Sequence, residues 1–396
     1  MNQPAVKNPM DAPTVITAAL VISAIGALFY NVLPIYVGAA QDYRGLDNQA
    51  VGFLSSAYFL GFNLVTISAF FWIRRISWAL IAAVATPIAA ISMSAGAFVS
   101  GYIPLLVTTA IAGGAFAALY GVGTTILSDV SNPARWYGVK IAVEALPGVF
   151  LLLLLPGTAI VRWGFDGAIV GIVVVLVFLS PLLFWIPAAG NTGSNNGENV
   201  RTANAIQSSW IWFPLLATLV FFCGASAMWA FVERIANQGG FAADSVGLLL
   251  AVTLVFAVLG SLMAATIGGR FGNVRPFCAG GALFLLSIFA LHEPQSFAIY
   301  AVGACLLTFS FGFMIPIAVT EVADLDVDGR FIVLSVPAIG IGAMTGPGIA
   351  GVLSQSGSFN SMLAFGAASI VLACIFLAVG ASFARRVTGE EIAAEI

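Results

Sequence analysis

The segment YGVKIAVEALPG, residues 137–148, places a lysine and a carboxylate one helical turn apart in a mainly apolar stretch. Lys140 and Glu144 are four residues apart, so both side chains lie on one face of a helix and each can stabilise the other's charge. A charge at the centre of a bilayer costs about 2.5 to 3.5 kcal/mol on insertion scales. A membrane helix therefore keeps such a charge only where it faces water, a partner or a solute.

Helix geometry gives the two residues different depths and hence different expected roles. With Trp136 at the membrane edge, a rise of about 1.5 Å per residue puts Lys140 roughly 6 Å deep and Glu144 roughly 12 Å deep. Glu144 could take up and release a proton as its surroundings change between water and a dehydrated cavity. We predict Glu144 as the proton-coupling residue and Lys140 as a binding residue for an anionic solute, although lysine can also snorkel to the interface. The alternative is a structural ion pair that braces the fifth helix against the eighth or tenth.

Further polar and aromatic side chains extend this candidate site. An amide or phenol inside a membrane needs a hydrogen-bonding partner, which is either another helix or a solute. We therefore predict that the substrate path also includes Tyr30, Asn31, Asn63, Tyr120 and Trp229.

The composition shows that these residues belong to a membrane protein. Of the 396 residues 60% are hydrophobic and only 8% are charged, and the mean hydropathy is +1.04. A spanning helix needs about 20 mostly apolar residues. Because the apolar runs are continuous, whereas barrel strands alternate over about ten residues, we predict an all-α fold with twelve transmembrane helices. The expected spans are 12–39, 49–73, 77–99, 103–128, 137–161, 167–188, 210–233, 244–268, 275–292, 296–320, 331–354 and 359–384.

A polar segment and an internal repeat divide the chain into two halves. AAGNTGSNNGENVRTANAIQSS, residues 188–209, has the composition of a flexible linker. We therefore expect a six-helix half over 1–188, a cytoplasmic linker over 189–209 and a second six-helix half over 210–396. At a constant offset of 195, AVGFL at 50–54 matches SVGLL at 245–249, and Arg75, Asp129 and Arg135 match Arg270, Asp324 and Arg330.

In this organisation the chain resembles the major facilitator superfamily. IGGRFGNVRP keeps Arg270, Gly272 and Arg275 of the loop motif of that family, with Gly269 at the aspartate position, and GAMTGPGIAG resembles its Gly-Pro helix motif. The first half keeps only WIRRIS at the loop motif, and Thr109 stands where many drug exporters carry an arginine. The resemblance implies two bundles related by pseudo-two-fold symmetry and secondary transport by alternating access, with the site near the midplane.

Charged residues at the helix ends form a second group of candidates. The resemblance implies that acids and arginines at the repeat positions close the inner mouth as a latch, while ordinary loop solvation is the alternative. A charged pair at the outer end of the seventh helix is either an outer gate or simply a charged helix terminus. The predicted gating residues are Arg75, Asp129, Arg135, Arg270, Glu321, Asp324, Arg330, Glu233 and Arg234.

The positive charges predict an orientation. A cytoplasmic amino terminus places ten lysines and arginines inside and three outside, which favours cytoplasmic termini under the positive-inside rule. We expect a monomer in the cell membrane, in a bacterium the inner membrane.

Several function classes lack the residues they need. The four cysteines lie in expected spans without metal-ligand spacing, and the only histidine, His292, falls in an outer loop. We therefore expect no metal and no cofactor. An intramembrane enzyme would need clustered Asp, His or Cys at membrane depth, so we do not expect an enzyme, and no basic footprint for nucleic acid is present.

The remaining classes are transporters and, less directly, a sensor with the same fold. Because there is no nucleotide-binding motif, the energy must come from an ion gradient. We expect proton-coupled uptake of a small, partly apolar organic anion such as a monocarboxylate or an aromatic acid, with sodium as a possible substitute for the proton. The alternative is an antiporter that exports a drug-like or cationic compound in exchange for protons.

Overall fold

The computed structural model describes residues 8–189, 210–267, 269–292, 294, 296–326, 331 and 334–395. Twelve helices in these residues are long and apolar enough to span a membrane, and the same residues contain no strand, which confirms the all-α prediction. Most of the expected linker lies outside the described residues. The helices are α1 Pro13–Arg44, α2 Asn48–Trp72, α3 Trp78–Phe98, α4 Tyr102–Ser128, α5 Pro133–Leu154, α6 Ala159–Leu179, α7 Trp212–Gln238, α8 Ala243–Ile267, α9 Val274–Leu291, α10 Phe297–Leu325, α11 Ser335–Leu353 and α12 Asn360–Glu395, with short 3₁₀ helices η1 Pro9–Asp11 and η2 Ser180–Trp185.

The expected spans differ from the helices at the junction of α5 and α6, and α12 also extends beyond the expected residue 384 to Glu395. The apolar run predicted a helix to residue 161, but α5 ends at Leu154 and a turn containing Pro156 and Gly157 precedes α6. Proline lacks a backbone donor and glycine favours turns, so Pro156 and Gly157 permit a turn inside an unbroken apolar stretch, whereas Pro147–Gly148 stays inside α5. Hydropathy alone cannot detect such a break.

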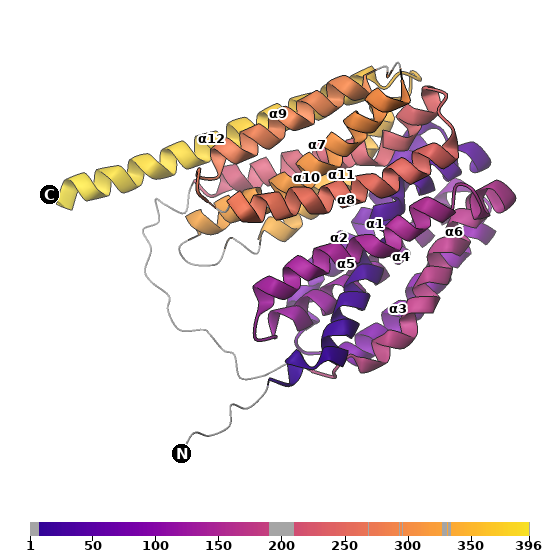
Figure 1. Cartoon of the computed structure of the whole chain (residues 1–396). Coiled ribbons are helices and arrows are strands. Elements are labelled where there is room, and N and C mark those ends of the chain that lie inside the picture. The colour runs from indigo at the N-terminus through magenta and orange to yellow at the C-terminus, as the bar shows by residue number, and fades with distance from the viewer. Residues whose placement is uncertain are drawn as a thin grey trace.

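The helices form two bundles with the same packing pattern (Figure 1). In α1–α6, helices α2 and α3 pack on α4, and α1 contacts α4, α5 and α6. In α7–α12, helices α8 and α9 pack on α10, and α7 contacts α10, α11 and α12. Each helix of the first bundle thus has the neighbours of the helix six places later.

We name the two ends of the molecule by the segments that they carry. The terminal face carries η1, the α2–α3 turn at residues 73–77 and the α4–α5 turn at residues 129–132. The far face carries the α1–α2 turn at residues 45–47 and the α7–α8 turn at residues 239–242. Positive-inside reasoning predicts that the terminal face is cytoplasmic.

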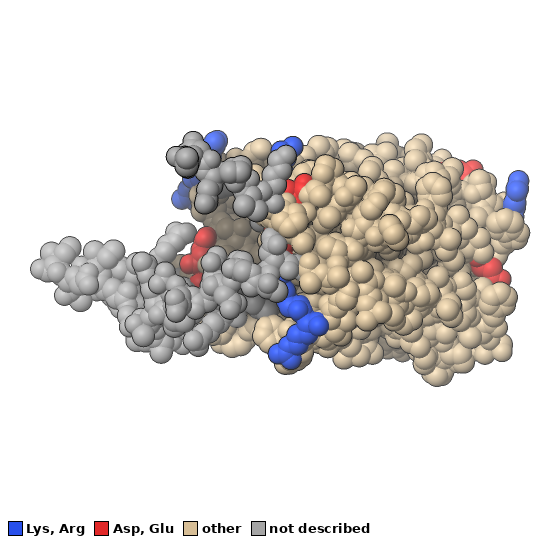
Figure 2. Space-filling model, turned by 90° about the horizontal axis from the view of Figure 1, so that it is seen from below, with Lys and Arg blue, Asp and Glu red and all other residues tan. Residues whose placement is uncertain are grey.

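The polar contacts that we describe between the bundles lie at the far face and around mid-membrane, and one of them, from Asn63 to the Gly340 carbonyl, lies in the half of α2 and α11 nearer the terminal face. At mid-membrane the Trp229 indole donates to the Tyr30 carbonyl at 2.9 Å. At the far face Asn48 donates to the Ser354 carbonyl at 2.7 Å, and the side chains of Gln49 and Gln355 are in contact. Figure 2 shows a recess at the left end of the molecule, the end toward which the C-terminus points in Figure 1. The bundles are therefore joined at the far face, and the molecule is hollowed at the terminal face.

Candidate functional site

The Lys140–Glu144 pair forms within α5. Lys140 Nζ lies 2.6 Å from Glu144 Oε1. Lys140 is only 4% exposed, and the Glu144 side chain is 13% exposed. Since the two charges pair along one helix, the ion pair that we describe does not brace α5 against α8 or α10. Both charges are held at membrane depth by each other, as the four-residue spacing predicts.

An aromatic ring on α4 supports the lysine. Lys140 Nζ lies 4.0 Å from the centroid of the Tyr120 ring, a cation–π contact that stabilises an ammonium in a poorly hydrated place. Tyr120 can occupy this position because Gly26 of α1 has no side chain. A Cβ on Gly26 would lie 2.6 Å from Tyr120 Cβ, so α1 and α4 meet closely at this level.

Asn31 of α1 completes the cluster through the backbone of α5. Its Nδ2 donates to the Glu144 carbonyl at 2.8 Å. Pro147 lies inside α5 and has no N–H, so this turn of the helix is short of donors. The Asn31 amide supplies a donor to the Glu144 carbonyl in this turn, and the bond fixes α1 against α5. The structure therefore brings together four predicted site residues: Asn31, Tyr120, Lys140 and Glu144.

Tyr30 and Trp229 lie where the two bundles meet. The Tyr30 ring contacts Phe59 of α2, with centroids 5.9 Å apart, and Phe311 of α10, with centroids 6.1 Å apart. Trp229 is buried, and its indole N–H donates a hydrogen bond to the Tyr30 carbonyl. Trp229 therefore joins α7 to α1, while the half-buried Tyr30 ring lies among aromatic rings of both bundles.

The amide of Asn63 is also used between helices. Its Nδ2 donates to the Gly340 carbonyl of α11 at 2.6 Å. For both predicted asparagines, the partner in this conformation is a backbone carbonyl of another helix. Their predicted role in substrate binding stays a prediction.

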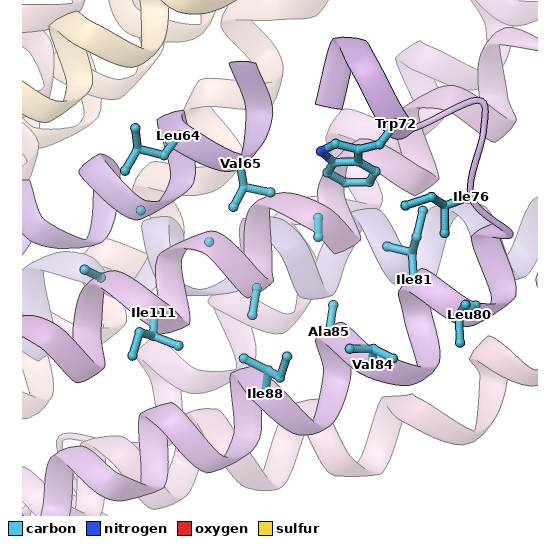
Figure 3. A pocket seen from close by; sticks show the side chains of 15 residues that line it. Leu64, Val65, Trp72, Ile76, Leu80, Ile81, Val84, Ala85, Ile88 and Ile111 are labelled. Atoms are coloured by element: carbon cyan, nitrogen blue, oxygen red, sulfur yellow. The ribbon is translucent and has the colours of Figure 1, made fainter. Parts of the chain in front are cut away.

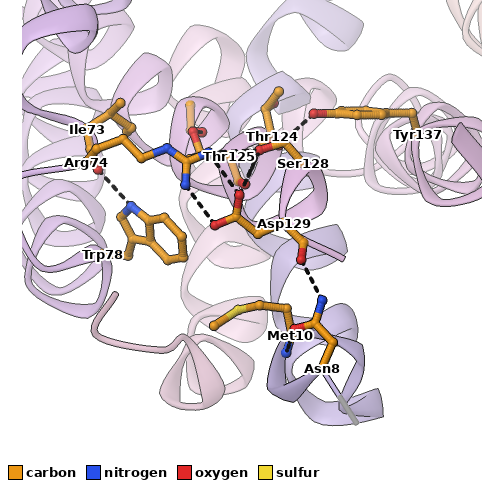
Figure 4. Close-up of polar contacts among 11 residues, drawn as sticks. Asn8, Met10, Ile73, Arg74, Trp78, Thr124, Thr125, Ser128, Asp129 and Tyr137 are labelled. Carbon is orange, nitrogen blue, oxygen red and sulfur yellow. Dashed lines mark hydrogen bonds and ion pairs between the residues drawn. The ribbon is translucent and has the colours of Figure 1, made fainter. Parts of the chain in front are cut away.

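At the terminal face, the charged contact within the first bundle differs from the expected one. Asp129 binds Arg74, at 2.8 and 2.9 Å, and not Arg75 as the repeat alignment implied (Figure 4). Arg75 is exposed, and it forms no ion pair with any other residue in the described part of the chain. Arg135 instead stacks over Trp136, with 5.4 Å from its guanidinium carbon to the ring centroid. Of two adjacent arginines at a helix end, Arg74 is the one that reaches α4, and only the folded backbone decides this.

The corresponding acid of the second bundle makes a related contact. Asp324 at the end of α10 accepts a hydrogen bond at 2.7 Å from Asn273, in the turn before α9. Asp129 at the end of α4 likewise binds the turn before α3, so both acids connect equivalent elements. Glu321 is buried, Arg270 is exposed, and Arg330 lies outside the described residues.

The segment before α1 also binds the α4–α5 turn, which the sequence did not indicate. Asn8 donates to the Asp129 carbonyl at 2.8 Å (Figure 4). Ser131 donates to Asp11 from its backbone at 2.8 Å and from its hydroxyl at 2.5 Å. These bonds favour the ionised carboxyl and hold the pKa of Asp11 below its usual value.

At the far face an arginine joins the bundles. Arg234 of α7 is 6% exposed and binds Asp42 of α1 through two hydrogen bonds, at 2.6 and 3.0 Å. It also binds Glu233, at 2.5 and 2.8 Å. Gly38 makes room for this group, because a Cβ there would lie 2.4 Å from Glu233 Oε2. The sequence indicated Glu233 and Arg234, but sequence reasoning missed Asp42.

Sequence comparison finds no match, whereas structural comparison finds many. No family model matches the chain, and no curated protein matches it. A structure of a mutant form of the nucleoside transporter NupG matches with a TM-score of 0.73 at 12% identity, covering 91% of this chain and 98% of that one. A D-xylose-proton symporter matches with a TM-score of 0.73 at 12% identity, covering 92% and 96%.

A third match is a bacterial homolog of the human lysosomal transporter Spinster, in an inward-facing and unoccupied conformation. Its TM-score is 0.68 at 14% identity, over 94% of this chain and 97% of that one. The outward conformation of the transporter FucP, described as a major facilitator superfamily protein, matches with a TM-score of 0.60 at 13% identity, over 94% and 99%. The twelve helices, the repeated packing and these matches over nearly full length agree. The chain therefore has the fold of the major facilitator superfamily transporters.

Proposed function

We propose that this multi-pass membrane protein is a proton-coupled secondary transporter that takes up a small, partly apolar organic anion by alternating access. The observation that carries the proposal is the buried pair on α5, in which Lys140 and Glu144 neutralise each other 2.6 Å apart. In this proposal the solute carboxylate replaces Glu144 as the partner of Lys140. Protonation of Glu144 at the same time avoids leaving an unpaired carboxylate in a low-dielectric place.

The surroundings of the pair support a solute with one charged end and one apolar end. The Lys140 ammonium and the Tyr120 ring belong to the first bundle. At Tyr30, next to Asn31 in α1, the second bundle contributes aromatic rings, with Phe311 contacting both Tyr30 and Phe222. An aromatic or aliphatic acid could place its carboxylate at the lysine and its apolar part against these rings.

The arrangement of the bundles supports alternating access. Contacts at the far face, including Arg234 with Asp42, join the bundles there, and the recess opens at the terminal face. Transport requires the far-face contacts to break and terminal-face contacts to form. We propose Glu233 and Arg234 as the far gate, and the predicted acids and arginines at the repeat positions of both halves as the opposite gate. The proposal places the protein as a monomer in the cell membrane, with its terminal face toward the cytoplasm.

The first experiment separates proton coupling from solute binding. Purified protein is screened by thermal shift against monocarboxylates and aromatic acids, and each stabilising acid is then tested for uptake into liposomes under an inward proton gradient. We expect Glu144→Gln to lose gradient-driven accumulation but to keep exchange of labelled for unlabelled acid. Lys140→Ala should weaken binding about 10- to 100-fold, because a charge-assisted hydrogen bond is worth roughly 1.5 to 3 kcal/mol.

Glu144→Asp is the matched control, since it keeps an ionisable carboxyl and should keep part of the accumulation. Gradient-driven accumulation by Glu144→Gln at the parental level would contradict the proton role. The antiporter would be favoured instead if the protein exports cations in exchange for protons and no acid raises its unfolding temperature. The shared fold of the D-xylose-proton symporter supports proton coupling but leaves the solute to this experiment.

A further inference from the structure

A long apolar groove runs along the outside of the first bundle, away from the Lys140–Glu144 pair. It is formed where α2 and α3 both pack on α4, and it has a volume of about 770 Å³ (Figure 3). Its wall on α2 runs from Gly61 to Trp72, and its wall on α3 runs from Leu80 to Ile88. Leu64, Leu80 and Ile111 are exposed along it. The groove thus faces the hydrocarbon of the membrane.

The length of the groove matches one leaflet. Eleven residues separate Gly61 from Trp72, which at about 1.5 Å per residue gives roughly 16 Å. The hydrocarbon core of a bilayer is about 30 Å thick. The groove therefore extends from about mid-membrane to the terminal face. An apolar groove of this size does not hold water favourably, because water there finds no polar partners.

The terminal-face end of the groove carries an arginine that has no ion pair within the described part of the chain. Trp72 and Ile76 line that end, and Arg75 lies in the same turn, with its N–H bonded to the Trp72 carbonyl. Its neighbour Arg74 is neutralised by Asp129, whereas the exposed Arg75 has no ion pair among the residues that we describe. The Trp72 indole next to it is typical of the membrane interface.

The geometry points to a bound anionic phospholipid, with one acyl chain in the α2–α3–α4 groove and its phosphate at Arg75. A lipid fits better than a second copy of the chain, because the apolar part ends after one leaflet and is followed directly by a cation. A basic residue near an anionic membrane surface contributes about a fivefold preference for the charged lipid. This lipid site is separate from the proposed transport site on α5.

The test measures which lipid stays on the protein. The full chain is placed in nanodiscs of equal dioleoylphosphatidylglycerol and dioleoylphosphatidylcholine, moved to detergent, and analysed by native mass spectrometry. We expect the parent to keep one phosphatidylglycerol in preference to phosphatidylcholine. Arg75→Gln should lower that preference about fivefold, while Arg275→Gln, which removes an exposed arginine of the second bundle at the same face, should leave it unchanged.

Two further variants fill the groove without changing its charge. Val84→Trp on α3 and Ala118→Phe on α4 should remove the retained lipid of both headgroups, and circular dichroism with thermal unfolding identifies a variant that has not folded. Equal retention by the parent, Arg75→Gln and Val84→Trp would overturn the proposal. A parental dimer that Val84→Trp dissociates, with no change in bound lipid, would also overturn it, because the groove would then hold a second copy.

Discussion

At the residue scale, the site depends on how a lysine is kept charged inside a membrane. Lys140 is supported by the Glu144 carboxylate at 2.6 Å and by Tyr120, whose ring centroid lies 4.0 Å from Nζ. When the proposed proton neutralises Glu144, the ring is the support that remains. Tyr120 is thus expected to hold the lysine in place during the step in which the solute binds.

We therefore predict different outcomes for two substitutions of Tyr120. Tyr120→Phe keeps the ring and should keep uptake, whereas Tyr120→Leu removes it and should weaken solute binding by about 1 to 2 kcal/mol, or roughly 5- to 30-fold. Binding of the best stabilising acid, measured by titration calorimetry, checks the prediction. Equal affinities for the two variants would show that the ring only fills space.

At the element scale, the far face depends on backbone contact between α2 and α11. A Cβ on Gly52 would lie 2.4 Å from the Pro347 carbonyl oxygen. A backbone atom cannot turn aside as a flexible side chain can, so any larger residue at this position must push the two helices apart. Gly121 of α4 differs in this respect, because the nearest atom to an added Cβ is Ile73 Cδ1 at an ordinary 3.7 Å.

Gly52→Ala should therefore open the far face, and Gly121→Ala should not. Overpacking of this kind costs roughly 1 to 3 kcal/mol, which should raise the share of far-open molecules about tenfold. The check is maleimide labelling of Ser354→Cys, a buried far-face position, in a background without the four native cysteines. If Ser354→Cys is labelled at the same rate in the Gly52→Ala and Gly121→Ala variants, the prediction is wrong.

At the scale of the whole molecule, closure of the far face includes an ion pair between bundles. The Asp42 side chain is 44% exposed, so its bond to Arg234 is worth only about 1 kcal/mol after solvent screening. A weak contact suits a gate, because transport must break it in every cycle. Arg44 and Asp166 form a comparable pair at 3.0 Å at the same face, but both belong to the first bundle.

Asp42→Asn should therefore loosen the joint between the bundles, while Asp166→Asn should act only within the first one. Hydrogen exchange followed by mass spectrometry checks this. We expect faster exchange in both the α1–α2 and α7–α8 turns for Asp42→Asn. For Asp166→Asn any change should be limited to the end of α3, whose carbonyls Arg44 also binds. Faster exchange in the α7–α8 turn of Asp166→Asn would contradict the assignment.

The sequence alone determined the helices and much of the α5 site. An apolar run long enough to cross the hydrocarbon core must form a helix or join a closed barrel, so the continuous apolar runs predicted twelve spanning helices. The repeat at an offset of 195 predicted which positions are equivalent in the two halves. The four-residue spacing predicted the contact between Lys140 and Glu144, because helix geometry fixes it. These features depend on neighbours along the chain, which are visible in one dimension.

Only the tertiary structure decided which distant groups meet. The end of α5, the choice of Arg74 over Arg75 by Asp129, the role of Asp42 and the ring beneath Lys140 each depend on how helices from remote segments pack. The groove beside Arg75 is likewise a property of three helices together. Hydropathy and periodicity determine which face of a helix is apolar, but packing between helices determines what that face touches.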